Sequence, residues 1–290
     1  MHDSNSFPVE DKAVLITGCS SGIGRHMAIA LANHGYLVFA TVRKESDAED
    51  LRNLGISKLM PVCPLDLTNM DHITEVEGLV TDELNRRGLK GLFALINNAG
   101  GGTPAPIELM EIERFRTELQ ARVLGSVAMV QAFLPLIRQG NGRIVWIMTP
   151  ALIPTPYVTN IHACDFAIDC IARTLDIELK PWKIPNIRIK CGGIKTPAGL
   201  RTSSDVDVIL QKASGDKVSL YGKALRKWAK DMTEFDRKRT EPEMVAKIVL
   251  DALLAERPKR KYSVGHMVNA ARFLEAMPQS IGDRILKMRF

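Results

Sequence analysis

Short, uninterrupted apolar runs alternate with longer segments of helical spacing along the chain. The run AVLIT (13–17) precedes a glycine-rich turn, and RHMAIALANHG (25–35) follows that turn with apolar residues at helical spacing. Gly35 ends this segment, as glycine commonly does just beyond a helix. The next run, YLVFATV (36–42), is again apolar throughout. Such runs predict strands of a parallel sheet that is covered on both faces.

The same alternation continues toward the end of the chain. Further strands are predicted within 58–66, 91–100, 142–148 and 186–193, with a short one at 260–265. Helices are expected from Asn69 or Met70, over about 111–138 and 160–180, from 241 onward, and over 273–290. Strands alternating with amphipathic helices imply right-handed crossovers and helices on both faces of the sheet. The expected fold class is therefore α/β, with one doubly wound parallel sheet.

The pattern indicates one domain with an inserted segment. Residues 1–11 form a polar N-terminal arm, and residues 12–290 form the domain. Between 198 and 239 the alternation loosens and charged residues increase, which is typical of a helical lid over a substrate site. A solvated surface excursion is the alternative interpretation of this segment. Its apolar residues among basic ones suit a cover over a bulky, mostly apolar substrate.

Composition narrows the class of protein. The chain has 290 residues, of which 46% are apolar and 25% charged, with a formal net charge of +6. No dense Lys/Arg block with interleaved aromatic residues occurs, so a nucleic-acid partner is not expected. The N-terminus is polar and acidic rather than a signal peptide, and no apolar run predicts a membrane span. The five cysteines form no Cys-x-x-Cys pair, which indicates a cytoplasmic protein with no metal site.

The glycine-rich turn carries the first functional signal. Gly18, Gly22 and Gly24 lie between a predicted strand and a predicted helix. Glycines there let the backbone approach a pyrophosphate, and the helix N-terminus offers free N–H groups to the phosphates. Arg43 follows the second strand, where a cation favours the 2′-phosphate of NADP(H) over the free hydroxyl of NAD, and the Ser20 hydroxyl could assist.

Three motifs in order resemble those of the short-chain dehydrogenase/reductase family. TGCSSGIG (17–24) resembles its glycine motif, NNAG (97–100) resembles the motif after its fourth strand, and Asp66 in PLDLT resembles its adenine-contacting Asp. The resemblance covers about 12–197. It implies a Rossmann-like fold, an NADP(H) cofactor and, through the long helix, a homodimer or homotetramer. The implied cofactor-binding residues are Gly18, Ser20, Ser21, Gly22, Ile23, Gly24, Arg43, Asp66, Leu67, Asn97, Ala99, Gly100 and Thr196.

The catalytic half departs from the family pattern. The family usually carries Asn, Ser, Tyr and Lys in its site, with the Tyr exchanging a proton with the substrate oxygen and the Lys lowering its pKa. At the corresponding positions this sequence has Arg122, Thr149, His162 and Phe166. Tyr157 lies nearby, but no Lys follows it at four residues. The usual Tyr–Lys chemistry is therefore not expected.

The substituted residues suggest other roles. His162 is a candidate acid because its ordinary pKa suits proton transfer, or it simply fills the vacated position. Asp165 could orient the imidazole, serve as a counter-ion for a cationic substrate, or remain a solvated helix residue. Arg122 needs a carboxylate partner, for which Glu118 and Asp165 are candidates, or it binds an anionic substrate group. Thr149 keeps a hydroxyl.

Three hypotheses about function follow. The first is an NADP(H)-dependent oxidoreductase that transfers hydride to a bulky iminium, enone or ketone. An iminium needs no proton donor, and the resemblance implies such chemistry in natural-product (alkaloid) pathways. The second is an NADP(H)-binding isomerase, cyclase or non-catalytic sensor. The third is a pseudoenzyme without cofactor, against which the intact glycine turn argues. The expected partner in each enzyme case is a small-molecule substrate.

Overall fold

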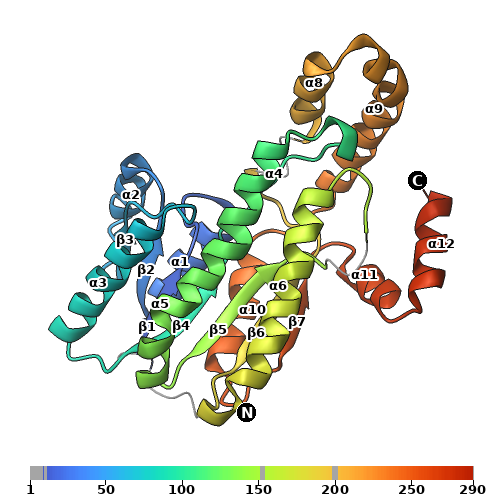
Figure 1. Ribbon diagram of the computed structural model, residues 1–290. Helices are drawn as coiled ribbons and strands as arrows, with labels where there is room; N and C mark the ends of the chain where they lie inside the picture. Colours follow the sequence, from blue (N-terminus) through green and yellow to red (C-terminus); the bar gives the residue numbers. More distant parts are fainter. Residues whose placement is uncertain (1–8, 10–11, 151–153, 198–201, 290) are drawn as a thin grey trace.

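A seven-stranded, fully parallel sheet forms the centre of the computed structural model, which describes residues 9, 12–150, 154–197 and 202–289. The strand order is β3-β2-β1-β4-β5-β6-β7. The order reverses between β1 and β4, because the chain crosses over from β3 to β4, as in other doubly wound sheets. The strands are β1 Ala13–Ile16, β2 Leu37–Thr41, β3 Leu59–Val62, β4 Leu92–Asn97, β5 Arg143–Met148, β6 Asn186–Cys191 and β7 Lys261–Val264. Figure 1 shows helices on both faces of this sheet.

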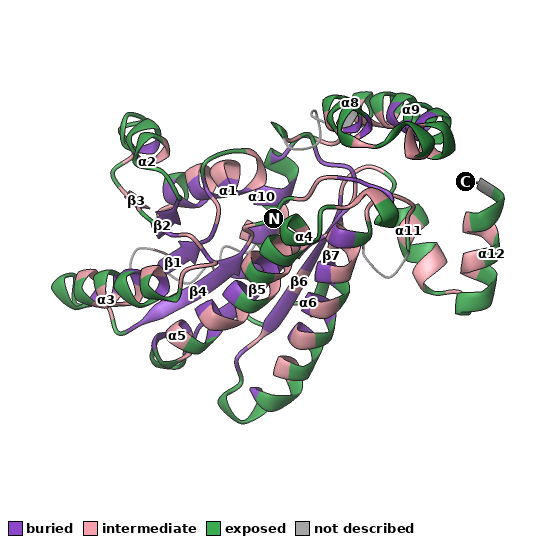
Figure 2. Cartoon of the chain, turned by 45° about the horizontal axis from the view of Figure 1, so that its top comes forward, coloured by how far each residue is buried: buried purple, intermediate pink, exposed green. Residues whose placement is uncertain are grey.

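Each face of the sheet has its own apolar core. Helices α1 (Gly22–Asn33), α2 (Glu45–Arg52) and α10 (Glu243–Leu254) contribute buried residues to the first core. Helices α3 (Met70–Arg86), α5 (Gly125–Gln139) and α6 (Thr159–Glu178) contribute to the second. In Figure 2 the strands are largely purple, and the green residues gather on the outward faces of the helices. The predicted α/β fold class with a doubly wound parallel sheet is confirmed.

Local sequence signals explain where several elements begin and end. The β1 residues are all buried, as the apolar run predicts for a central strand. The Asn69 side chain accepts a hydrogen bond from the Asp71 N–H and caps α3, as expected from its residue type. Gly35 has φ +105°, a backbone conformation that a residue with a Cβ rarely adopts, and it follows the end of α1.

The predicted long helix is present, but a π-helical turn interrupts it. Helix α4 (Ile112–Leu119) passes through η2 (Gln120–Leu124) into α5 without leaving the helical course. A π turn inserts one extra residue into a helix and often marks a functional site. By length and composition alone, the combined run of 112–139 is long and apolar enough to cross a membrane, so the expectation that no such segment occurs was wrong. Here α5 packs against β4 and α3 as a core helix.

The segment predicted as a lid contains a helical pair. Helices α8 (Thr202–Lys212) and α9 (Gly215–Arg237) pack against each other around Val206, Leu225 and Trp228. Leu109, at the end of the short helix η1 (Ile107–Leu109), and Tyr157 also pack on this cluster. Figure 1 shows the pair at the end of the molecule where α4 begins. The first lid residues, 198–201, and the arm, apart from residue 9, lie outside the described residues.

The C-terminal region differs from the expectation of one terminal helix. After η3 (Lys180–Trp182), β6, α10 and β7, the chain forms α11 (Val268–Glu275) and α12 (Gln279–Arg289). Pro278 separates them, because its ring clashes with the preceding turn and it has no N–H for a helical hydrogen bond. The single-helix prediction was therefore wrong at this residue.

Candidate active site

The glycine-rich turn joins β1 to α1 at the carboxyl edge of the sheet. Gly18 and Gly22 have φ of +73° and +55°. A Cβ added to Gly24 would lie 2.1 Å from the Gly18 carbonyl oxygen, so the close approach of this turn to the helix requires glycine. Ser21 is the N-cap of α1, and its side chain makes no capping hydrogen bond in the described structure. The helix N-terminus therefore presents backbone N–H groups toward this edge.

Asn98 fixes the shape of the turn from the neighbouring strand. Its amide nitrogen donates to the carbonyl oxygens of Thr17 (2.9 Å) and Gly18 (3.1 Å). The backbone N–H groups of Asn98 and Ala99 donate to the Thr17 hydroxyl oxygen, each at 3.0 Å. Sequence reasoning assigned no role to Asn98, although it is the second Asn of NNAG. Its role is to hold the glycine turn in place.

Asn97, the last residue of β4, has an unusual environment. Its side chain is 4% exposed, and within the described structure neither its amide nitrogen nor its amide oxygen has a hydrogen-bond partner. A buried amide without partners costs free energy, and natural proteins rarely leave one so. Asn97 lies on the strand next to β1, beside the glycine turn. Its position and its unmet hydrogen bonds suit contact with a ligand bound at this edge.

The other residues predicted to bind cofactor surround the same edge. Ser20 and Arg43 are exposed after β1 and β2. The Asp66 carboxylate accepts hydrogen bonds from the Thr68 N–H (2.9 Å) and hydroxyl (2.8 Å). These bonds, above all the one from the N–H, lower the pKa of Asp66. A Cβ on Gly22 would lie 3.3 Å from the Thr196 methyl group, so Thr196 covers the turn. Leu67 is buried, Ile23 and Ala99 are partly buried, and Gly100 is exposed.

Three of the four predicted catalytic residues form one hydrogen-bonded cluster. Asp165, on α6, is 0% exposed, and Arg122, in the π turn, is 8% exposed. The Arg122 Nη2 lies 2.6 Å from Asp165 Oδ1, and the Thr149 hydroxyl donates to Asp165 Oδ2 at 2.5 Å. The second Arg122 nitrogen donates to the carbonyl oxygens of Gly101 (3.4 Å) and Ile161 (3.2 Å). We name Arg122, Thr149 and Asp165 the polar triad.

The polar triad identifies which of the two candidate carboxylates pairs with Arg122. The expected carboxylate partner of Arg122 is Asp165. Glu118, the other candidate, lies one turn earlier and instead accepts hydrogen bonds from the Asn160 amide (2.6 Å) and the Thr103 N–H (3.4 Å). Burial raises the pKa of Glu118. Since both Asp165 oxygens are engaged by Arg122 and Thr149, this carboxylate acts within the triad.

His162 and Phe166 lie on the first turns of α6. His162 is partly buried, and its backbone N–H donates to the Val158 carbonyl at 3.0 Å. Phe166 is 39% exposed. The three-residue spacing from His162 to Asp165 places them near each other on the helix. The catalytic role of His162 stays a prediction.

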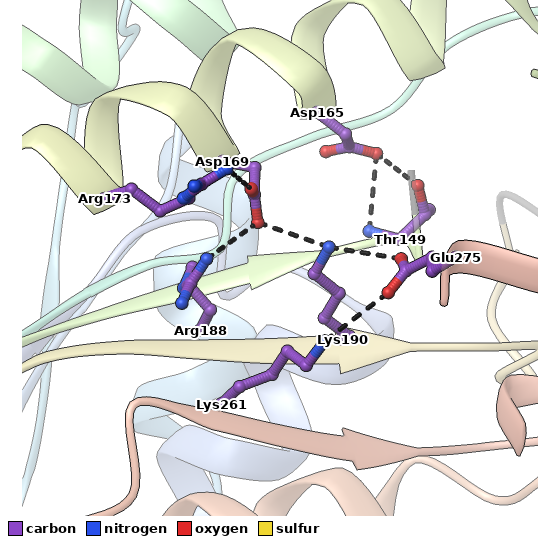
Figure 3. Close-up of polar contacts among 8 residues, drawn as sticks. All are labelled: Thr149, Asp165, Asp169, Arg173, Arg188, Lys190, Lys261 and Glu275. Carbon is purple, nitrogen blue, oxygen red and sulfur yellow. Dashed lines mark hydrogen bonds and ion pairs between the residues drawn. The ribbon is translucent and has the colours of Figure 1, made fainter. Parts of the chain in front are cut away.

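A second group of charged residues lies one turn along α6 from the polar triad. Asp169 contacts the nitrogens of Lys190 and Arg188, each at 3.2 Å, and Lys190 also lies 3.3 Å from a Glu275 oxygen. Lys190 is 1% exposed, and Figure 3 shows it between the two carboxylates. Glu275 is the last residue of α11, so this cluster ties the C-terminal region to β6 and α6. We name Asp169, Arg188, Lys190 and Glu275 the lower cluster.

A cavity of about 370 Å³ lies between the helical pair and α4. Its walls include Thr103, Leu109, Phe115, Asn160, Ile209 and Lys212. Asn160 links the cavity to the polar triad, because it lies little more than one turn before Asp165 on α6 and donates to Glu118. Within the described part of the chain, no group of three His, Cys, Asp or Glu side chains is arranged to hold a metal ion.

Comparison with solved structures places this fold among known dehydrogenases. A short-chain dehydrogenase from Streptomyces avermitilis superposes with a TM-score of 0.73 at 19% identity, covering 99% of this chain and 97% of that one. A short chain dehydrogenase from Burkholderia cenocepacia, solved in complex with NADP, gives a TM-score of 0.72 at 21% identity, with 97% and 99% covered. These likenesses concern the fold.

Comparison of sequences identifies the family. A mouse estradiol 17-beta-dehydrogenase 2 is 30% identical over 99% of this chain and 77% of its own length. A 3-amino-tetrahydro-pyrrolizinone reductase from Xenorhabdus hominickii is 30% identical, covering 88% of this chain and 87% of its own. The model of the family described as short chain dehydrogenase matches residues 12–207, which include the glycine turn, Asn97 and the polar triad. The chain therefore belongs to the short-chain dehydrogenase family of oxidoreductases.

Proposed function

We propose that this protein is an NADP(H)-dependent oxidoreductase with an altered set of acid–base residues, acting on a bulky organic substrate. The observation that carries the proposal is the glycine turn beside the unpartnered Asn97 amide. A Cβ on Gly24 would strike the Gly18 carbonyl at 2.1 Å, and the buried amide of Asn97 has no partner within the described structure. A tight turn at a helix N-terminus next to unmet hydrogen bonds suits a dinucleotide.

The residues present fit this cofactor group by group. Backbone N–H groups of Ser20 to Ile23 would hold the pyrophosphate, and Asp66 would contact the adenine. Thr196, which lies against the glycine turn, would contact the nicotinamide amide. Arg43 would meet a ribose 2′-phosphate with its guanidinium. The cofactor supplies or accepts a hydride when bound. The polar triad and His162 would then orient the substrate and govern the position of its protons.

The cavity beside the helical pair offers room for a bulky substrate that has both apolar and polar parts. Apolar residues such as Leu109, Phe115 and Ile209 line it together with charged residues such as Arg114 and Lys212. Ligand sites use apolar walls for affinity and polar groups for orientation. Two relatives are named for ring systems, estradiol in one and a pyrrolizinone in the other. A polycyclic substrate, as natural-product metabolism would supply, fits these observations.

The Arg43→Ala variant tests the cofactor assignment. Removing the guanidinium should weaken NADPH binding by about 10- to 100-fold, because a charge-assisted hydrogen bond to the 2′-phosphate is lost. NADH binding should change less than about twofold, since NADH has no group for Arg43 to meet. Fluorescence titration of the purified protein with both cofactors measures this, with Lys44→Ala as the exposed neighbouring control. Equal losses for both cofactors would contradict the 2′-phosphate assignment.

The His162→Phe variant tests the proton donor. For a ketone, kcat should fall by at least about 100-fold, because the developing alkoxide needs a proton that His162 would supply. For an iminium ion, kcat should stay within about threefold, since hydride addition yields a neutral amine without proton transfer. Single-turnover rates with deuterated cofactor isolate this step. An unchanged rate with a ketone would remove His162 from the mechanism.

The proposal includes that the protein forms a homodimer or homotetramer and works in the cytoplasm. Leu124, Phe166 and Ile177, on η2 and α6, are 61%, 39% and 75% exposed. Exposed apolar side chains on neighbouring helices are typical of an interface between copies. The five cysteines are free thiols, as is common in a reducing compartment.

A further inference from the structure

The Thr149 hydroxyl has its single hydrogen directed at Asp165. Its oxygen lies 2.5 Å from Asp165 Oδ2, and the Thr149 backbone N–H also donates to that oxygen at 3.3 Å. Asp165 forms an ion pair with Arg122 through its other oxygen, at 2.6 Å. A carboxylate in an ion pair accepts hydrogen bonds and has no hydrogen to give. The hydrogen between Thr149 and Asp165 is therefore the hydroxyl hydrogen, and Figure 3 shows both contacts on one oxygen.

This arrangement makes Thr149 an acceptor toward any third group. A hydroxyl has one hydrogen and two lone pairs, so the bond to Asp165 leaves only lone pairs. The two contacts from one residue to one carboxylate oxygen also fix the side chain. A carbonyl oxygen, or the alkoxide that forms from it, brings a second set of lone pairs and gains no hydrogen bond there. A substrate group that carries a hydrogen gains one.

A second carboxyl group, that of Glu118, lies close to the polar triad. Asp165 balances the Arg122 charge. Glu118, one turn before Arg122, is held by two neutral donors, the Asn160 amide and the Thr103 N–H. Both Arg122 and Glu118 bridge the segment 101–103 to the start of α6 at 160–161. Burial raises the pKa of Glu118 and so disfavours its charge, and a cation bound nearby would favour the ionised form.

We propose that Thr149 selects for a protonated imine by accepting a hydrogen bond from its N–H, an inference that rests on the proposed oxidoreductase function. With NADPH bound, a hydride would pass from its nicotinamide to the iminium carbon. The C=N π pair moves to nitrogen, which keeps its hydrogen and becomes a neutral amine. The positive charge passes to the oxidised cofactor, so no proton is taken from the protein. Thr149 touches the reacting nitrogen throughout.

Three matched probes test the role of Thr149. Dihydroisoquinoline, kept protonated, offers an iminium N–H; N-methyldihydroisoquinolinium has the same charge without that hydrogen; α-tetralone is the ketone of similar shape. Calorimetric titration in the presence of NADP+ measures their binding without turnover, and NADPH oxidation measures their reduction. Thr149→Val should weaken dihydroisoquinoline binding by about 10- to 100-fold, the size of one hydrogen bond to a charged group. Binding of the N-methyl ion should change less than about twofold. Thr149→Ser, which keeps the hydroxyl, should restore most of the affinity.

The outcomes separate this inference from the proposed function. Equal effects of Thr149→Val on the two cations, failure of Thr149→Ser to restore affinity, or tighter binding of α-tetralone than of dihydroisoquinoline by the unaltered protein would each overturn the selection for N–H. If dihydroisoquinoline does not bind at all, the inference also falls, while NADPH binding and α-tetralone reduction would keep the oxidoreductase proposal. Absence of NADPH binding would overturn the proposed function, and the imine titration on the protein alone would still decide the role of Thr149.

Discussion

The Asp165→Ala variant should lower the free energy of unfolding by about 3–5 kcal/mol, which is the usual cost of removing one partner from a buried ion pair. Arg122 is only 8% exposed, so water cannot replace the lost carboxylate freely. Its remaining hydrogen bonds, to the carbonyls of Gly101 and Ile161, are both longer than the 2.6 Å contact to Asp165. Urea unfolding followed by circular dichroism measures the change, as a lower midpoint at an unchanged slope.

The matched control replaces both members of the pair. Arg122→Met combined with Asp165→Leu removes the two buried charges together, and such replacements are often neutral or stabilising. The double variant should therefore unfold at a higher urea concentration than Asp165→Ala. If the double variant is the less stable of the two, the cost does not come from an uncompensated guanidinium.

The Asp169→Ala variant should lower the free energy of unfolding by about 3 kcal/mol or more, because it removes the carboxylate that Lys190 and Arg188 share. Lys190 is 1% exposed and would keep only Glu275 among the partners that the described structure shows. Lys190→Met is the control: Asp169 keeps Arg188 and Arg173, and Glu275 keeps Lys261 at 3.5 Å. Calorimetric melting temperatures should therefore fall clearly further for Asp169→Ala. Equal shifts would show that the lower cluster does not depend on Asp169.

The fold could be predicted because its signals are local. Apolar runs predicted the strands, and the change to helical spacing placed the start of α3 at Asn69 or Met70. The glycine turn marked the connection between β1 and α1. The break at Pro278 was missed, because the terminal segment was read by its helical spacing alone. The π turn at 120–124 was missed as well, since an extra residue in a helical turn has no composition of its own.

The candidate site was predicted only in part, because many of its contacts join residues that are distant in the sequence. Asp165 was one of two candidate partners for Arg122, because a buried guanidinium requires a carboxylate, but the choice over Glu118 depended on how α4 meets α6. The hydrogen bonds between Asn98 and Thr17 could not be predicted, because they depend on the register of β4 against β1. The lower cluster joins residues 169, 188, 190 and 275 from three elements, α6, β6 and α11, and only the packed fold brings these charges together.

The contact between Lys190 and Glu275 has a consequence for synthesis of the chain. Lys190 is in β6, whereas Glu275 is separated from it by 85 residues and lies near the C-terminus. When β6 has left the ribosome, Glu275 has not yet been translated, so the buried ammonium has only Asp169 and water to neutralise it. Sheet strands up to β6 can pair as they emerge. Lys190 can therefore reach its full set of buried partners only after α11 has been made, which places the burial of this ammonium late in folding.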